Sequence, residues 1–418
     1  MAVMRFIRGR CRASGVAVGL TAVLMAGVAG CSAPSIGSQA DALRLAAPVN
    51  SIDPVPDTAP VPDTAPVPDT APVAVTSAVV EVESVANPGS WDPSSVIYEG
   101  SPARLSIVVD SPEARDVDVT VKLPGSDSIV GTNAVSVPPG ASTVTVPLSA
   151  DLHAWLPGAG DQRPATASHV NLTVTETDAA VGMQEHTSEV PVTIAPRPVV
   201  FLHGMWGTAR WWDPYTQPGG FLSSAHPQWK GFAVDTMNTG SPWAPLAAVN
   251  TVKENADLAW AFIQSRMRDL NAHEVDVVAH SLGGVIARRM LHDPLYGTKA
   301  QNAIRTVVTL GTPNGGSPCS DALIVPGNRE LTIPAMNAFN EQNPGYPGVR
   351  SVALYSGHWS TTCFADGAGD SMVPVWSALA QPVDVSQRLT PGVDHDKMTG
   401  DSRVFNDYVK PALTDPSQ

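Results

Sequence analysis

Ser281 is the residue whose sequence context most clearly points to chemistry. It stands in Ala279-His280-Ser281-Leu282-Gly283-Gly284, directly after the largely apolar run Val275–Val278 and before a helix-like stretch. A nucleophile on a sharp turn between a strand and a helix needs small neighbours, because the turn is strained and other elements pass close by. Ala279 and Gly283 meet that need, so the motif predicts Ser281 as a nucleophile that forms a covalent intermediate.

The pentapeptide Ala279–Gly283 resembles the Ala-x-Ser-x-Gly turn of small secreted bacterial lipases, which have the α/β-hydrolase fold. The resemblance runs from Pro198 to the C-terminus and implies that an acid and then a histidine follow the serine. His395 stands between the last predicted strand and the final helix-like stretch Val404–Leu413, where that family has its catalytic base. His358 is the alternative base.

The orienting acid is expected in Gly369-Asp370-Ser371-Met372-Val373-Pro374, which resembles the Asp-x-x-Val-Pro stretch of lipases. Asp370 would fix the tautomer of His395 and stabilise the imidazolium that forms during the reaction. Asp366 is its main rival. Asp394 and Asp396 flank the histidine, but immediate neighbours on a loop rarely face back onto the same ring.

Two backbone N–H groups are expected to bind the oxyanion of a tetrahedral intermediate. One belongs to Leu282, the residue after the serine. The segment His203-Gly204-Met205 follows the first apolar strand and resembles the His-Gly-x motif of lipases, which implies Met205 as the second donor. His203 is expected to brace this loop.

Together these residues predict acyl transfer from an ester through an acyl-enzyme, that is, a lipase or carboxylesterase. The reaction requires no metal or other cofactor, and no cluster with metal-ligand spacing is evident, although the sequence leaves a structural calcium open. An acyltransferase would use the same residues with an alcohol in place of water. A non-catalytic binding lipoprotein carrying a degenerate hydrolase is the alternative from another class.

The elements that must position these residues alternate between strands and helices. Apolar runs typical of strands buried on both faces occur at Val199–Leu202, Phe232–Val234, Val275–Val278, Thr306–Leu310 and Val349–Leu354. Between them, Asn255–Asp269 has apolar residues at helical spacing. Residues 197–418 are therefore expected to form a mostly parallel sheet flanked by helices, the α/β-hydrolase fold. The aromatic residues of the segment Trp206–Gly231, and the long segment Cys319–Tyr346, either cover the site or belong to the core.

Residues 74–196 have a different pattern, in which Val and Thr alternate with polar residues in short runs separated by turn formers. Alternation with a period of two is typical of strands with one buried face. We therefore expect an antiparallel, immunoglobulin-like sandwich of about seven strands. His153, His169 and His186 are scattered through it and form no catalytic cluster, so it is interpreted as a spacer or a binding module.

The N-terminus has the pattern of a bacterial lipoprotein signal peptide. Four arginines at positions 5, 8, 10 and 12 precede an apolar run that ends in Val28-Ala29-Gly30-Cys31, which resembles a lipobox. Residues 1–30 would be removed and Cys31 lipidated, placing the protein at the outer face of a membrane of the cell envelope. An ordinary secretory signal and an uncleaved anchor are the alternatives. In residues 31–73, three copies of Val-Pro-Asp-Thr-Ala-Pro predict an extended linker.

The remaining cysteines are expected to pair. Cys11 leaves with the signal peptide and Cys31 is modified, which leaves Cys319 and Cys363 in a compartment where disulfides persist. Two free buried thiols are the alternative.

The net charge constrains the partners of the protein. The formal charge of −14 argues against nucleic acid, because binding a polyanion requires a cationic surface. The expected partners are an ester or lipid substrate and, through the lipidated N-terminus, a membrane, while the oligomeric state is not predicted.

Overall fold

A computed structural model describes residues 71–124, 128–149, 152–154, 169–178, 182–322, 324–362, 365–390 and 392–414. The predicted signal peptide, Cys31 and the three repeats lie outside these ranges, so lipidation and the extended linker stay predictions. Across the described ranges, no helix is both long and apolar enough to cross a membrane.

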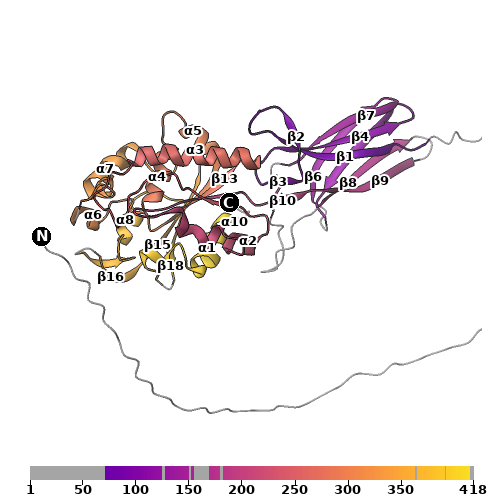
Figure 1. Ribbon diagram of the computed structural model, residues 1–418. Helices are drawn as coiled ribbons and strands as arrows, with labels where there is room; N and C mark the ends of the chain where they lie inside the picture. Colours follow the sequence, from indigo (N-terminus) through magenta and orange to yellow (C-terminus); the bar gives the residue numbers. More distant parts are fainter. Residues whose placement is uncertain are drawn as a thin grey trace, which may run out of the picture. The chain divides into compact units, whose positions relative to one another are not determined.

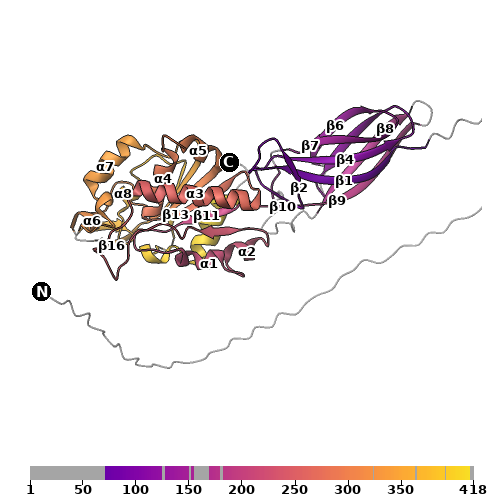
Figure 2. The same ribbon diagram turned by 45° about the horizontal axis from the view of Figure 1, so that its top comes forward.

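The first part of the described chain consists of antiparallel sheets. One four-stranded sheet has the order β2-β1-β4-β7 and the other β6-β5-β8-β9 (Figures 1 and 2). The strands are β1 (Ala74–Glu83), β2 (Trp91–Pro93), β4 (Ala103–Ser111), β5 (Arg115–Lys122), β6 (Ile129–Val137), β7 (Gly140–Pro147), β8 (His169–Asp178) and β9 (Gly182–Pro191). A further parallel pair joins β3 (Val96–Tyr98) to β10 (Thr193–Ala195).

Alternating side chains of these strands are buried, as the period of two predicts. In β4, Leu105, Ile107 and Val109 are buried, while in β5 the same holds for Val117 and Val119. Side chains from both four-stranded sheets belong to one hydrophobic core. The sequence thus predicted two antiparallel layers, and the specifically immunoglobulin-like relationship stays a prediction.

The second part contains a six-stranded parallel sheet with the order β12-β11-β13-β14-β15-β18. Its strands are β11 (Val199–Leu202), β12 (Gly231–Ala233), β13 (Val275–His280), β14 (Ile304–Leu310), β15 (Arg350–Ser356) and β18 (Val385–Leu389). Because all six run in one direction, their carboxyl ends meet at one edge of the sheet, where open α/β sheets bind ligands.

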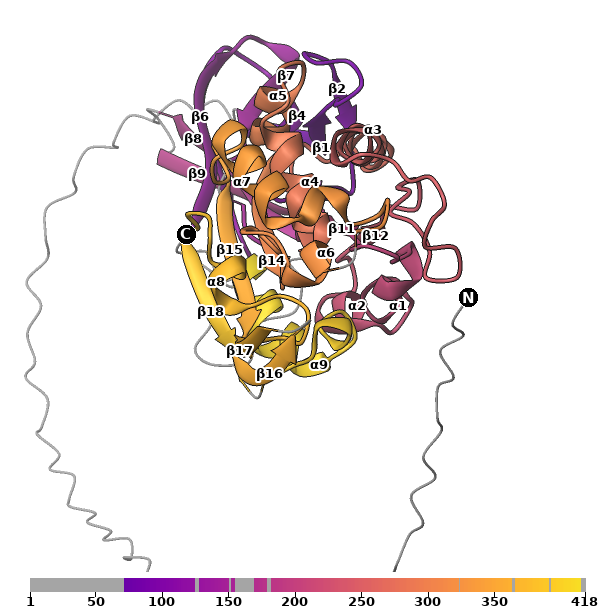
Figure 3. The same cartoon turned by 90° about the vertical axis from the view of Figure 1, so that its left-hand side faces the viewer.

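Helices cover both faces of this sheet (Figures 1 and 3). On one face, Leu202 and Val277 pack with side chains of α3 (Val252–Leu270) and α4 (Leu282–Leu291). On the other face, Phe201 and Val278 pack with Trp212 and other residues from α1, α2 and the C-terminal helices. The remaining helices are η1 (Ala209–Trp212), α1 (Asp213–Thr216), α2 (Phe221–Ala225), α5 (Gly297–Ala303), α6 (Pro318–Ala322), η2 (Arg329–Leu331), α7 (Ile333–Gln342), α8 (Val375–Ala378), η3 (His395–Lys397), α9 (Ser402–Val404), η4 (Phe405–Val409) and α10 (Lys410–Thr414).

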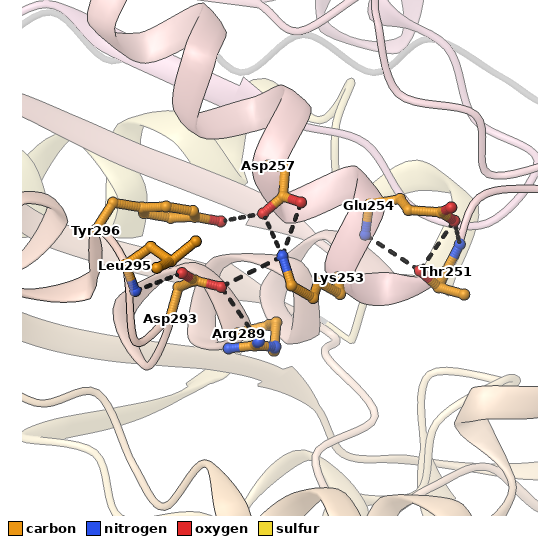
Figure 4. A network of polar contacts seen from close by, with 8 residues as sticks. All are labelled: Thr251, Lys253, Glu254, Asp257, Arg289, Asp293, Leu295 and Tyr296. Atoms are coloured by element: carbon orange, nitrogen blue, oxygen red, sulfur yellow. Dashed lines mark hydrogen bonds and ion pairs between the residues drawn. The ribbon is translucent and has the colours of Figure 1, made fainter.

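A polar network ties the start of α3 to the end of α4 (Figure 4). Lys253 Nζ lies 2.8 Å from Asp257 Oδ2 and 3.5 Å from Asp293 Oδ2. The Asp293 carboxylate also pairs with Arg289 at 3.2 Å, and the Tyr296 hydroxyl donates to Asp257 at 2.8 Å. The network fixes the N-terminal turns of α3 against α4, the helix that follows Ser281.

Candidate active site

Ser281 occupies a strained turn between β13, which ends at His280, and α4, which begins at Leu282. Its φ of 55° and ψ of −125° lie in a region that non-glycine residues rarely adopt. The Ser281 N–H donates to the Leu310 carbonyl at 2.9 Å, which ties the turn to the end of β14. A Cβ at Gly283 would lie 2.6 Å from the Leu202 carbonyl oxygen, so this position must be small, as the sequence motif predicted.

The structure brings Asp370 and His395 together. His395 Nδ1 lies 2.7 Å from Asp370 Oδ2, and the His395 N–H donates to the Asp370 carbonyl at 2.8 Å. The other carboxylate oxygen, Oδ1, accepts the N–H groups of Met372 at 3.0 Å and Val373 at 2.7 Å. The Asp370 side chain is almost completely buried. Its carboxylate is therefore held in one orientation and fixes the imidazole in turn.

The rival residues lie elsewhere. His358 begins β16 (His358–Thr362), and its Nδ1 and Nε2 lie 3.0 Å from Ser356 Oγ and 3.5 Å from Asp394 Oδ1. Asp394 also bonds Lys397 Nζ at 2.5 Å. Asp366 lies in β17 (Ala365–Gly369), which pairs with β16. The contact of Asp370 with His395, at 2.7 Å, is shorter than that of Asp394 with His358, at 3.5 Å, and the side chain of Asp366 lies outside the described part of the structure.

The predicted oxyanion loop passes directly beside the serine. A Cβ at Gly204 would lie 2.7 Å from Ser281 Cβ, so only glycine allows this approach. His203 is buried, and its Nδ1 lies 3.1 Å from the Gly204 carbonyl and 3.3 Å from Thr239 Oγ1. Burial lowers the pKa of His203, which favours a neutral ring that braces the loop, as predicted. The next residue, Met205, faces the same cavity as Ser281.

His280 links the turn of Ser281 to the loop of His395. Its Nε2 lies 2.8 Å from the His395 carbonyl oxygen, and the centroids of the two rings are 4.6 Å apart. Complete burial lowers the pKa of His280 well below its ordinary value, so the ring is neutral and its Nε2–H is the donor. The backbone of His395 is thus held by Asp370 at its N–H and by His280 at its carbonyl.

A cavity of about 860 Å³ contains Ser281 and His395 in its wall. Its lining is mainly apolar. The other lining residues are Met205, Trp206, Trp211, Pro242, His280, Pro313, Ser317, Cys319, Ser320, Ala322, Val325, Asn328, Leu331, Ser371, Met372, Val373 and Asp396. The aromatic residues of the segment Trp206–Gly231 therefore have two roles, because Trp206 and Trp211 line the cavity whereas Trp212 and Trp229 are buried in the core. The segment Cys319–Tyr346 supplies a wall from Cys319 to Leu331.

The wall of the cavity contains one of the two cysteines that are predicted to form a disulfide. Cys319 contributes to the lining, but Cys363 lies outside the described residues, so their pairing stays a prediction. Within the part of the chain that the structure describes, no group of three or more His, Cys, Asp or Glu side chains is placed to hold a metal ion.

The sequence model of the alpha/beta hydrolase family matches residues 199–411, just over half of the 418-residue chain. The chain belongs to this family. No curated protein matches it at a significant level. Among solved structures, the mature lipase BlEst2 of Bacillus licheniformis is 18% identical with a TM-score of 0.41, over 52% of this chain and 92% of that one. Carboxylesterase CesB of Bacillus subtilis is 11% identical with a TM-score of 0.33, over 62% and 93%.

The sequence analysis missed two features of this hydrolase site, one glycine and one loop. Gly311 follows β14 with a φ of +56°, and a Cβ there would lie 2.5 Å from Asp370 Oδ2 and 3.1 Å from His395 Nδ1. A glycine directly after a buried strand was the available signal. The second feature is the loop that carries Pro242 into the wall, and its sequence contains no catalytic motif that would reveal it.

Proposed function

We propose that the protein is a serine carboxylic ester hydrolase, a lipase or carboxylesterase. The observation that carries the proposal is the Asp370–His395 pair, joined at 2.7 Å, in the wall of the cavity that also exposes Ser281 on its strained turn. A nucleophile, a general base and an orienting acid, here from three separate segments, are the groups that acyl transfer by a serine hydrolase uses.

In the proposed reaction, the Ser281 hydroxyl oxygen attacks the ester carbonyl carbon while His395 Nε2 takes its proton. Asp370 accepts the Nδ1–H bond, which keeps Nε2 available as the base and stabilises the imidazolium. The N–H groups of Met205 and Leu282 would bind the oxyanion. His395 then protonates the leaving alcohol, and a water molecule, deprotonated by His395, hydrolyses the acyl-enzyme. No step requires a metal or cofactor.

The cavity supports an uncharged, apolar substrate. Among the described residues of its lining there is one carboxylate, Asp396, and no lysine or arginine, so an anionic acyl group would meet no cationic partner there. Two indole rings, from Trp206 and Trp211, offer apolar surface to an acyl chain or an alcohol group. The volume of about 860 Å³ lies within the range typical of small-molecule sites.

We further propose that Cys31 is lipidated at the bacterial cell envelope, that Cys319 and Cys363 pair, and that residues 74–196 form an immunoglobulin-like spacer. The lipobox-like stretch Val28–Cys31, the count of cysteines and the two antiparallel sheets support these three proposals. Loss of a fatty-acid label in Cys31→Ser tests the first. A two-proton change in intact mass on reduction tests the second.

The decisive experiment measures hydrolysis of p-nitrophenyl butyrate and p-nitrophenyl palmitate by the fragment from residue 71 onward, with Ser281→Ala as the control. Activity that disappears in Ser281→Ala is the expected result, and the ratio of the two rates separates an esterase from a lipase. A folded protein that hydrolyses neither ester, or a Ser281→Ala variant that is fully active, would contradict the proposal. Transfer of the acyl group to an added alcohol in preference to water would indicate an acyltransferase.

A further inference from the structure

The chain segments that line the cavity, called the rim here, also carry exposed hydrophobic side chains. Six large hydrophobic side chains are exposed in the described part of the hydrolase domain: Trp243, Leu246, Leu295, Ile324, Met372 and Trp376. All except Leu295 lie on segments that line the cavity. We propose that this rim docks the mouth of the cavity onto the surface of an aggregated, uncharged ester, such as a droplet of neutral acylglycerol. The inference rests on the proposed function and adds where its substrate is taken up.

The loop Ser241–Ala248 forms one side of the rim. Pro242 lines the cavity, while the next residue, Trp243, is 95% exposed and Leu246 is 78% exposed. The loop contains no charged residue. Exposing an indole and a leucine to water is unfavourable, whereas an apolar surface would stabilise both. Trp at such a position suits a boundary between water and lipid, because its ring is apolar and its N–H is polar.

The two ends of this loop, called its neck here, are joined by hydrogen bonds. These bonds hold the tip of the loop in place. The Asn250 N–H donates to the Asn238 carbonyl at 3.1 Å. Asn255, buried in α3, accepts the Asn238 N–H at 2.9 Å and donates to the Asn238 carbonyl at 3.3 Å. Directly after the neck, Thr251 and Glu254 form a capping box at the start of α3, the helix end that the network of Figure 4 holds.

Three other exposed side chains come from segments of the opposite walls. Ile324, 62% exposed, lies next to Val325 of the lining, and Met372 is itself part of the lining. Trp376 is half-exposed, and its ring lies against Gly315, between the lining residues Pro313 and Ser317. Exposed apolar side chains and cavity-lining residues are therefore contiguous along the same segments of the chain.

This continuity and the charge of the protein indicate the occupant. A protein partner seated on the rim would close the mouth of the cavity, whereas a droplet of ester presents substrate to it. The lining holds Asp396 but no cation, and the chain carries a formal net charge of −14. An anionic surface would therefore be repelled, and an uncharged one fits.

The test is a Trp243→Ser/Leu246→Ser double variant, with Leu295→Ser as the matched control, because Leu295 is 82% exposed but distant in sequence from the lining segments. The expected result is a rate on a tributyrin emulsion that falls roughly tenfold or more, while the rate on dissolved p-nitrophenyl acetate and the melting temperature stay unchanged. Leu295→Ser should match the wild type on both substrates. Equal rates of wild type and double variant on the emulsion, or an equal loss on both substrates, would overturn the proposal.

Adsorption to droplets separates this inference from the proposed function, because it requires no turnover. In the Ser281→Ala background, the protein should float with tributyrin droplets, and the double variant should remain in solution. Vesicles containing phosphatidylglycerol should bind less protein than the droplets. Stronger binding to these vesicles, or flotation that the two substitutions leave intact, would overturn the docking proposal even if ester hydrolysis is established.

Discussion

The two described regions bury their strands in different ways. In β4 of the antiparallel part, buried and accessible residues alternate, whereas all six residues of β13 in the parallel sheet are buried. The alternating strands leave one face of each sheet to water. The parallel sheet has helices on both faces, so its strand ends open into space that surrounding loops can enclose.

This difference explains where the candidate chemistry lies. Hydrogen bonds from Ser281 to Leu310 and from Gly311 to Leu354 hold the ends of neighbouring parallel strands in register. The turns that follow these ends place Gly311 beside Asp370 and His395, and Ser281 in the wall of the cavity that His395 also lines. None of the described residues of the antiparallel region lines the cavity. This difference between the two regions predicts that turnover depends on the strand ends of the parallel sheet.

The largest effect is expected for the proposed triad of Ser281, His395 and Asp370. Ser281→Ala and His395→Ala should each lower kcat by about 10⁴-fold or more, and the double variant should be little worse, because the three residues act as a unit. The measurement is steady-state hydrolysis of p-nitrophenyl butyrate. Independent partial losses that multiply in the double variant would contradict the assignment.

Gly311→Ala should lower kcat by on the order of 10²-fold. A Cβ 2.5 Å from Asp370 Oδ2 must displace the acid or its histidine, and a misplacement of about 1 Å has an effect of that size. The matched control is Gly140→Ala in the antiparallel region, where φ is +92° and, among the described residues, no atom beyond the two chain neighbours lies within 4 Å of the added Cβ. Both variants strain the backbone, so an equal loss of activity would assign the effect to strain alone.

His280→Phe should lower kcat by roughly tenfold, because the His395 carbonyl loses a buried donor. His280→Gln retains an N–H near the position of Nε2 and should recover most of the activity. The readout is the split between kcat and KM, with kcat expected to change more. Identical behaviour of the two variants would show that the 2.8 Å bond to His395 does not position the base.

Two leucine-to-alanine substitutions compare the hydrophobic cores of the antiparallel and parallel regions. Leu105→Ala in β4 and Leu202→Ala in β11 remove side chains that are fully buried, so each should lower the free energy of unfolding by about 2–5 kcal/mol. Only Leu202→Ala should also lower kcat/KM at a temperature where both variants are folded, because Leu202 directly precedes the loop of Met205. Chemical denaturation measures the loss of stability, and steady-state kinetics measures kcat/KM. A comparable loss of activity in Leu105→Ala would contradict the prediction that only the parallel sheet supports turnover.

The smallest expected effect is on the pH dependence of the free energy of unfolding. It arises from acidic residues near Arg197, in the segment between the two regions. Arg197, which follows β10, lies 3.7 Å from Glu99, 3.8 Å from Glu274 and 3.5 Å from Asp276. Desolvation raises the pKa of all three acids above their ordinary values of 4.5, 4.5 and 3.8. The folded protein therefore holds protons that the unfolded chain has released, and stability falls as the pH rises through the raised pKa values.

Asp276→Asn should make this slope shallower, because asparagine does not titrate. The measurement is the free energy of unfolding against pH, from the ordinary pKa of Asp276 upward. An unchanged slope in Asp276→Asn, or stability that rises over the same range, would contradict the predicted direction.

Local sequence patterns were enough to predict the strands and helices whose surroundings stay the same along their length. The apolar runs at Val199–Leu202 and Thr306–Leu310 are strands β11 and β14, and the predicted helix at Asn255–Asp269 is α3. That helix begins earlier, at Val252, because Thr251 and Glu254 cap it through side-chain bonds that the apolar spacing does not reveal. The turn at Ser281 was predictable because its small neighbours are required locally.

The alternation of strands and helices, and the place of Ser281 between a strand and a helix, could be predicted from the sequence because they depend on neighbours within a few residues. The contact of Asp370 with His395, and which tryptophans line the cavity, became visible only in the folded chain. The folded chain also showed why position 311 is glycine. These outcomes depend on contacts between segments separated by 25 to 115 residues, and the spacing of residue types along the chain carries no information about such contacts.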